Sequence, residues 1–276
     1  MPKLPLSPVA VFNLVRELRA GDERKPLVVG GARELVGALR RELTRDGDPG
    51  AVREASLGAL EDAAALVYVL AGDVTDEDER ALRAADRAGV PIVALGPTPH
   101  TAVPHVLATD VIPLAPGHGF PLEELGRRLG AKLDEGATSL AARLPVLRRG
   151  VSEALIAKVS RQNAILGAAI FIPGADFPAL TVNQLRMVLR LAQAHGQQLD
   201  VQRVPEILGV IGSGLGLRAL ARQAASALPL PRVALRGSVA YTGTRAVGEA
   251  ALRYFELLGE LGGRGPEPGA PGADRA

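Results

Sequence analysis

The fold of the first half of this chain is decided by the stretch Lys25-Pro26-Leu27-Val28-Val29-Gly30-Gly31 and the residues 32–43 that follow it. A short apolar run that ends in glycines is typical of a buried strand that leads into a turn. In residues 32–43, the apolar positions recur at helical spacing. The order strand, turn, helix is the first unit of a parallel α/β fold.

The same alternation continues along the next hundred residues. Further strands are predicted at 64–70, 91–95 and 111–114, and further helices at 75–88 and 121–133. Thr75 and Asp78 have the spacing of a helix cap at the start of 75–88. We therefore expect an α/β domain with a parallel sheet at 25–140.

An amphipathic helix is predicted before this domain, within residues 1–24. Ser7 has the side chain of a helix cap and Pro8 would take the first helical position. Val9, Phe12, Val15 and Leu18 then recur at helical spacing, which predicts one apolar face. No unbroken apolar run or cleavage signature follows Met1, so we expect no signal peptide and a cytoplasmic protein.

Composition excludes several classes of protein. Hydrophobic residues make up 47% of the 276 residues and charged residues 22%, which favours a folded chain over a disordered one. Because there is no cysteine, disulfides and thiolate metal sites are excluded. Aromatic residues are only 3%, so a site that stacks nucleic-acid bases is disfavoured.

Charge is distributed unevenly between the halves. Residues 155–254 contain eleven Arg or Lys and four Asp or Glu, a balance of +7, which leaves −5 for the rest. A basic half predicts an anionic partner, either a membrane surface or nucleic acid, although solvated helix faces explain such charges equally well. The few aromatic residues make nucleic acid the less favoured partner.

The turn after the first strand is where a phosphate site would lie, because backbone amides at a helix N-terminus bind anions. Gly30, Gly31 and Gly37 do not have the spacing of a Walker A loop, and the lysine and hydroxyl of that motif are missing. The Rossmann pattern Gly-x-Gly-x-x-Gly is missing too. We expect no cofactor. The alternative is a divergent nucleotide-binding switch that uses the backbone amides of these three glycines.

The order of elements over 25–135 resembles a small GTPase domain that has lost its catalytic motifs. A stretch similar to the GTPase segment "aspartate, apolar strand, aspartate" runs from Asp62 to Asp73. The strand at 91–95 is followed by Gly96-Pro97-Thr98-Pro99, whereas GTPases have Asn-Lys-x-Asp there to bind guanine. A later loop keeps Gly119 and loses the family's serine. The resemblance implies a degenerate P-loop GTPase-like domain.

The second half is predicted to be all α-helical, with turns at 173–176, 195–196 and 229–231. Glycines within helices cost up to ~1 kcal/mol each relative to alanine, so close helix packing must offset that cost. The glycines in this class are Gly167, Gly209, Gly212, Gly214, Gly216, Gly237, Gly243 and Gly248. The apolar runs 164–173 and 207–217 are shorter than the ~20 residues that span a bilayer.

Residues 155–176, 181–189, 214–222 and 240–250 resemble the YcjF-like family, catalogued as domain of unknown function 697. The resemblance implies a helical domain at 150–258 that follows a GTPase-like domain, with membrane association and no catalytic residue. The positions that carry the family pattern are Arg161, Gln162, Asn163, Pro173, Gly174, Asp176, Gln184, Arg186, Arg218, Arg222, Tyr241, Gly243 and Thr244.

Polar residues in this half have structural interpretations. Asn163, Gln184 and Arg186 are predicted to form a buried polar network, and Asp176 to cap the helix after it. The four histidines lack nearby carboxylate or cysteine partners, so we expect no metal site. The glycine- and proline-rich residues 259–276 are predicted to form a disordered tail.

The sequence thus predicts a non-catalytic, membrane-associated scaffold. Its expected partner is a membrane surface or another protein, including a second copy of the chain. Attachment to the cytoplasmic face of the inner membrane follows from this hypothesis. The alternatives are a nucleotide-binding, GTPase-related regulatory switch and, with less support, a nucleic-acid-binding protein.

Overall fold

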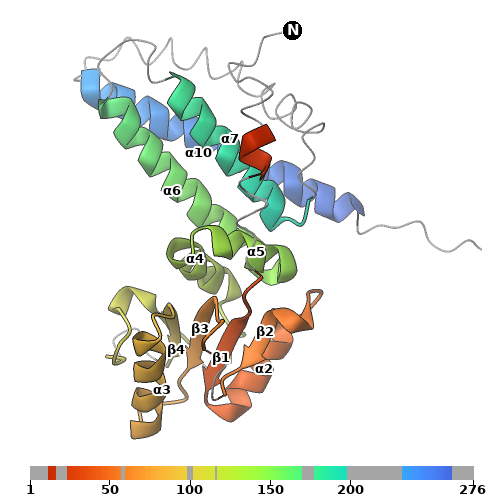
Figure 1. The fold of residues 1–276 in the computed structure, drawn as a ribbon, viewed down its shortest axis with the longest axis vertical. Helices are drawn as coiled ribbons and strands as arrows, with labels where there is room; N and C mark the ends of the chain where they lie inside the picture. The colour runs from red at the N-terminus through yellow and green to blue at the C-terminus, as the bar shows by residue number, and fades with distance from the viewer. Residues whose placement is uncertain are drawn as a thin grey trace, which may run out of the picture.

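The computed structural model describes residues 12–16, 24–56, 60–97, 102–115, 117–169, 177–197 and 232–262. It consists of an α/β half and a helical half, and the longest helices lead away from the sheet (Figure 1). This confirms the predicted fold class, a parallel sheet with helices followed by an all-α part.

The α/β half is a five-stranded sheet in the order β2-β1-β3-β4-β5, and every pair of neighbours is parallel. The strands are β1 (Leu27–Gly31), β2 (Val52–Glu54), β3 (Ala65–Val69), β4 (Ile92–Gly96) and β5 (Val111–Pro113). The helices between and after them are α2 (Arg33–Leu43), α3 (Asp76–Arg87), α4 (Leu122–Lys132) and α5 (Glu135–Arg143). Short 3-10 turns lie at Pro49–Ala51, Ala108–Asp110 and Pro145–Leu147.

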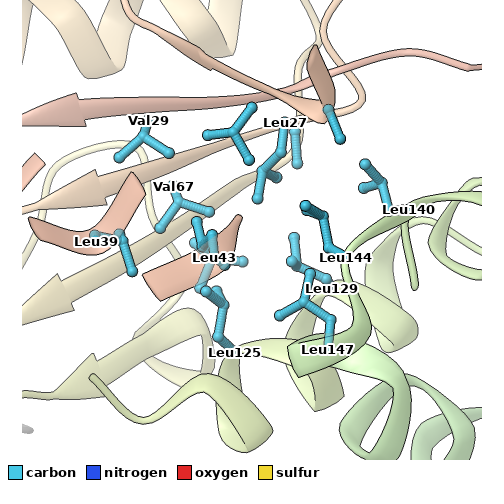
Figure 2. Packing of buried hydrophobic residues seen from close by; sticks show 14 of the residues in the cluster. Leu27, Val29, Leu39, Leu43, Val67, Leu125, Leu129, Leu140, Leu144 and Leu147 are labelled. Atoms are coloured by element: carbon cyan, nitrogen blue, oxygen red, sulfur yellow. The ribbon is translucent and has the colours of Figure 1, made fainter. Parts of the chain in front are cut away.

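Side chains of the central strands alternate between two buried layers, as successive residues of a strand must. Leu27 and Val29 belong to the layer beneath α2, α4 and α5, which Figure 2 shows from close by. Val28 belongs to the opposite layer, which contains Leu82 and Ala85 of α3. Because both faces are covered, these strands are continuous apolar runs, which is why they could be predicted from the sequence.

The predicted cap of α3 is confirmed. The Thr75 hydroxyl accepts a hydrogen bond from the Asp78 backbone amide at 3.2 Å, and the Asp78 carboxylate accepts one from the Thr75 amide at 2.9 Å. This reciprocal pair satisfies two amides at the helix terminus and fixes where α3 begins.

The helical half contains α6 (Arg148–Ala169), α7 (Phe177–Ala194) and α10 (Arg232–Gly262). Its core includes Ile156 of α6, Leu191 of α7 and Phe255 of α10. The predicted N-terminal helix is described only at 12–16, where Leu14 and Val15 are buried in this same core. Phe12 was expected on the apolar face but is 53% exposed. The buried face of this helix is formed by Leu14 and Val15 instead.

The helical half contributes residues to one of the two layers that cover the sheet, and no linker separates α5 from α6. Leu140 of α5 projects into the layer beneath the sheet, together with Leu144 and Leu147 of the segment that joins α5 to α6 (Figure 2). Val151 of α6 and Ala194 of α7 lie in that same layer. The stretch between the predicted domains, 141–149, is therefore part of the packing.

A close crossing of α4 and α6 joins the halves. A Cβ atom on Gly150 would lie 2.0 Å from the backbone oxygen of Glu123, and one on Gly126 would lie 2.8 Å from that of Leu147. One turn further along, a Cβ on Gly130 would lie 2.8 Å from Ala154. Only residues without side chains permit this approach, and these glycines are not among those predicted to pack closely.

The predicted role of glycine in the helical half holds at some positions and not at others. Gly248 packs against Ile156 and Gly237 against the backbone of Ala164, so α10 lies close to α6 at both sites. Among the described residues the prediction is wrong for Gly243, because a Cβ atom added there would meet no atom of a neighbouring element within 4 Å. Gly209, Gly212, Gly214 and Gly216 lie outside the described residues, as does the predicted tail beyond Gly262.

Replacing Gly150 should separate the two helices of the crossing. We expect Gly150→Ala to lower the free energy of unfolding by about 3 kcal/mol or more, because the added methyl group meets backbone that cannot rotate away. Gly37→Ala is the matched control, since the nearest atom to its added Cβ is an Arg41 nitrogen at 3.9 Å. That variant should gain up to ~1 kcal/mol from helix propensity. Urea denaturation measures the free energy of unfolding of both variants. Equal changes in the two variants would contradict the close contact of α4 and α6 at Gly150.

Candidate functional site

The carboxyl edge of the sheet is where this topology would place a ligand site. In doubly wound sheets with this strand order, ligands bind beyond the carboxyl ends of the strands, where the chain direction switches between β1 and β3. Gly30 and Gly31 end β1 at this switch point. They are two of the three glycines in the predicted alternative nucleotide site.

The turn after β1 is closed by packing against β3. Gly31 has a φ of +110°, and a Cβ atom there would lie 2.0 Å from the Val69 carbonyl oxygen. That same oxygen accepts a hydrogen bond from the Ala32 amide at 2.9 Å. Ala32 is the only residue between β1 and α2, so no loop is present that could wrap a phosphate. Gly37 lies in the second turn of α2, away from the strand end.

Asp78, an acidic side chain in the first turn of α3, is also engaged. The Tyr68 hydroxyl donates to Asp78 Oδ1 at 2.8 Å, while Asp78 Oδ2 accepts from Thr75. Burial alone would raise the pKa of Asp78, but the hydrogen bonds from Thr75 and Tyr68 hold it below its usual value. Burial first, and then Asp78, raise the pKa of the Tyr68 hydroxyl. These hydrogen bonds close the N-terminal end of α3 and occupy both oxygens of the Asp78 carboxylate.

A buried polar hub joins the three long helices of the second half. Thr244 Oγ1 accepts hydrogen bonds from Asn163 Nδ2 at 2.9 Å and from Gln184 Nε2 at 3.1 Å. Asn183 Nδ2 donates to Asn163 Oδ1 at 2.9 Å. Asn163 and Thr244 are completely buried. The polar hub, defined as Asn163, Asn183, Gln184 and Thr244, therefore connects α6, α7 and α10.

The polar hub brings together two of the three residues for which a network was predicted. Asn163 and Gln184 meet at Thr244, and Asn183 is a fourth member that the sequence analysis did not identify. Arg186, the third predicted residue, is half-buried on α7, two residues after Gln184. None of the four groups titrates near neutral pH, so the hub offers no general acid or base. The hub can hold the three helices in register, because sliding one helix along another would leave buried side-chain amides without hydrogen-bond partners.

The other family-pattern positions are not assembled into a site. Arg161 and Gln162 are exposed on α6, and the Tyr241 hydroxyl accepts a hydrogen bond from Arg245 at 3.4 Å on the surface of α10. Five further positions lie outside the described residues: Pro173, Gly174, Asp176, Arg218 and Arg222. The predicted cap of α7 by Asp176 therefore stays a prediction.

Part of the positive charge of the helical half is neutralised by the other half. Lys158 of α6 pairs with Asp134, and Arg190 of α7 pairs with Glu135, both acids lying at the start of α5. Asp134 has a φ of +48°, an unusual backbone conformation for a residue with a side chain. Burial, and then Arg190, lower the pKa of Lys158. These two ion pairs neutralise part of the positive charge of the helical half within the chain.

His195 is a structural residue at the end of α7. Its Nδ1 atom lies 2.9 Å from the Leu191 carbonyl oxygen, and its ring stacks on Phe255 with centroids 5.8 Å apart. Burial, and next the positive charge of Arg148, lower the pKa of His195 below its ordinary value of 6.5, against the opposing effects of the Leu191 carbonyl and Glu256. Within the described ranges, no group of three or more His, Cys, Asp or Glu side chains could hold a metal ion.

Removing the central hydroxyl of the polar hub should destabilise the bundle. Thr244→Val leaves the Asn163 and Gln184 amides without their acceptor, so we expect the free energy of unfolding to fall by about 1–3 kcal/mol. Thr242→Val makes the same change two residues earlier, at an exposed hydroxyl that bonds only to its own helix. Chemical denaturation should show almost no effect for that control, and the hub has no such role if the two variants behave alike.

Stability should depend on pH through His195. Because its pKa is lower in the folded than in the unfolded chain, the unfolded chain binds the proton more readily. The stabilisation is complete above about pH 6.5 and decreases as the pH falls from there through the lower folded pKa. Thermal denaturation between pH 8 and pH 5 should show a steeper loss for the wild type than for His195→Gln. Parallel profiles would assign the acid sensitivity to other groups.

Comparison of the chain with protein-family models and with curated proteins gave no match in either case.

Proposed function

We propose that this protein is a non-catalytic scaffold whose helical half docks on an anionic membrane surface at the cytoplasmic face. The observation that carries the proposal is the closed turn after β1. There, Gly31 and the Ala32 amide are both used to pack against Val69. The position at which this topology would place a ligand is therefore occupied by the protein itself, and the degenerate GTPase-like half serves as a support for the helices.

The outer end of α6 is the proposed contact region. It lies at the end of the bundle remote from the sheet (Figure 1). Ile165 is 69% exposed there, and the exposed Arg161 lies one turn earlier on the same helix face. An exposed large apolar residue beside a cation favours shallow attachment to a charged lipid surface. No helix in the described part of the chain is both long enough and apolar enough to cross a membrane.

Vesicle sedimentation tests this contact region. The full chain should bind vesicles of phosphatidylcholine and phosphatidylglycerol, and bind less to phosphatidylcholine alone. Arg161→Glu should lower the apparent affinity about tenfold or more, since each cation near an anionic surface contributes ~1 kcal/mol and reversal adds repulsion. Ile165→Asp should also weaken binding. Leu107→Asp and Arg53→Glu are the matched controls, as both residues are exposed in the α/β half.

Two results would contradict the proposal. One is equal sedimentation with and without the anionic lipid. The other is unchanged binding in both contact-region variants, which would move the interaction to another part of the chain or to a protein partner. A concentration-dependent change in mass without lipid would instead support self-association.

The second candidate function is a nucleotide-binding switch, which the position of Gly30 and Gly31 at the β1 and β3 switch point favours. Substitution of Gly31 cannot test it, because any side chain there would collide with the Val69 carbonyl and disturb the fold. Titration calorimetry of the unmodified chain with GTP and magnesium is decisive. We expect no heat of binding, and micromolar affinity would establish the switch in place of the scaffold.

A further inference from the structure

A polar groove lies where the two halves meet. Its volume is about 310 Å³, within the lower range of small-ligand sites, about 300–1,000 Å³. This junction groove is lined by Arg24, Asp48, Ser139, Ala142, Arg143 and Gln193. These residues come from the segment before β1, the connection between α2 and β2, helix α5 and the end of α7.

Helix α5 presents one face to the core and another to the junction groove. Leu140 and Leu144 project into the layer beneath the sheet (Figure 2). Ser139 and Arg143 each precede one of these leucines and are four residues apart, so they lie together on the neighbouring face. The core packing of the leucines thereby holds the serine and the arginine at the groove.

The charges that line the junction groove leave one cation in excess. Asp48 Oδ1 accepts from the Gly50 amide at 2.8 Å and Oδ2 from Arg143 Nε at 2.9 Å, so both carboxylate oxygens are engaged. The Gly50 amide, and next Arg143, lower the pKa of Asp48, which stays ionised. Arg143 and Asp48 neutralise one another. Arg24 also contributes to the lowered pKa of Asp48, but its guanidinium makes no hydrogen bond or salt bridge with a described residue. The groove therefore has a net positive charge.

Two neutral donors in the junction groove are also unused within the described structure. Ser139 is only 4% exposed, yet its hydroxyl has no hydrogen-bond partner among the described residues. Gln193 Oε1 accepts from the Thr138 hydroxyl at 3.1 Å, which leaves its amide NH₂ as a donor. Because the Ser139 hydroxyl makes no hydrogen bond within the described residues, a ligand in the groove that accepts from it adds a hydrogen bond.

We propose that the junction groove binds a small oxyanion, a phosphate group, through the Arg24 guanidinium, the Ser139 hydroxyl and the Gln193 amide. An oxyanion accepts hydrogen bonds from all three donors and balances the arginine charge. Because these donors belong to both halves, the bound anion stabilises their junction. This inference does not depend on membrane docking, since the proposed contact region lies at the far end of α6.

Thermal denaturation and calorimetry with inorganic phosphate test the site on the full chain. Phosphate should raise the melting temperature more than sodium chloride of equal ionic strength. Arg24→Gln should lower phosphate affinity at least about tenfold, because a charge-assisted hydrogen bond is lost, and Ser139→Ala should lower it about threefold or more. Arg33→Gln, at an exposed arginine of α2, should match the wild type.

Asp48→Asn is expected to strengthen phosphate binding, which a misfolded variant would not do. It removes the one carboxylate of the junction groove and frees Arg143, so we expect phosphate affinity to rise about threefold or more. The proposal is overturned if phosphate acts no better than sodium chloride on the wild type. It is also overturned if Arg24→Gln and Arg33→Gln respond alike.

Vesicles that contain phosphatidic acid distinguish two sources of the phosphate group, a lipid headgroup and a free phosphate compound. If Arg24→Gln loses vesicle binding together with phosphate binding, the groove takes a lipid headgroup. If vesicle binding is retained while phosphate binding is lost, the groove takes a free phosphate compound. Both results support the oxyanion site, and the behaviour of the contact-region variants on phosphatidylglycerol decides the scaffold hypothesis separately.

Discussion

The close approach of α4 and α6 is the constraint on which the arrangement of the two halves depends. At Gly126 and Gly150 the backbones themselves are in contact, so neither helix can rotate without a collision. The direction of α6 away from the sheet is set at this point. Helix α10 then follows α6 through the contacts at Gly237 and Gly248. The polar hub aligns α7 with both helices, because its amides find acceptors in only one register.

Much of the fold could be predicted because its elements carry their own local signals. The buried strands are apolar runs, and the Thr75 cap is a local pattern. By contrast, β2 has three residues, of which Arg53 and Glu54 are exposed, so a single buried position gives no pattern. Helix α5 was missed because it begins at the unusual backbone of Asp134 and has few large apolar residues.

The candidate sites were harder to predict, because they are formed by residues that are far apart in the sequence. Asn163 and Gln184 could be predicted as buried polar residues because they lie among apolar neighbours on helices. Their shared acceptor Thr244 comes from a distant helix, and the pairing becomes visible only when the helices are placed together. The junction groove is harder still, since it draws its lining from four segments of the chain. The glycines at the crossing of α4 and α6 gave no signal because Gly126 lies in a charged helix, where close packing is not expected.

The burial of Leu14 and Val15 has a consequence for synthesis of the protein on the ribosome. These residues leave the ribosome long before Phe255 of α10, yet all three are buried in one cluster. The sheet between them can assemble from neighbouring segments while translation continues, since βαβ units are built from consecutive parts of the chain. The cluster that buries Leu14 and Val15 is therefore complete only after residues 232–262 have emerged. Until then, part of the apolar surface of the N-terminal segment is available to chaperones.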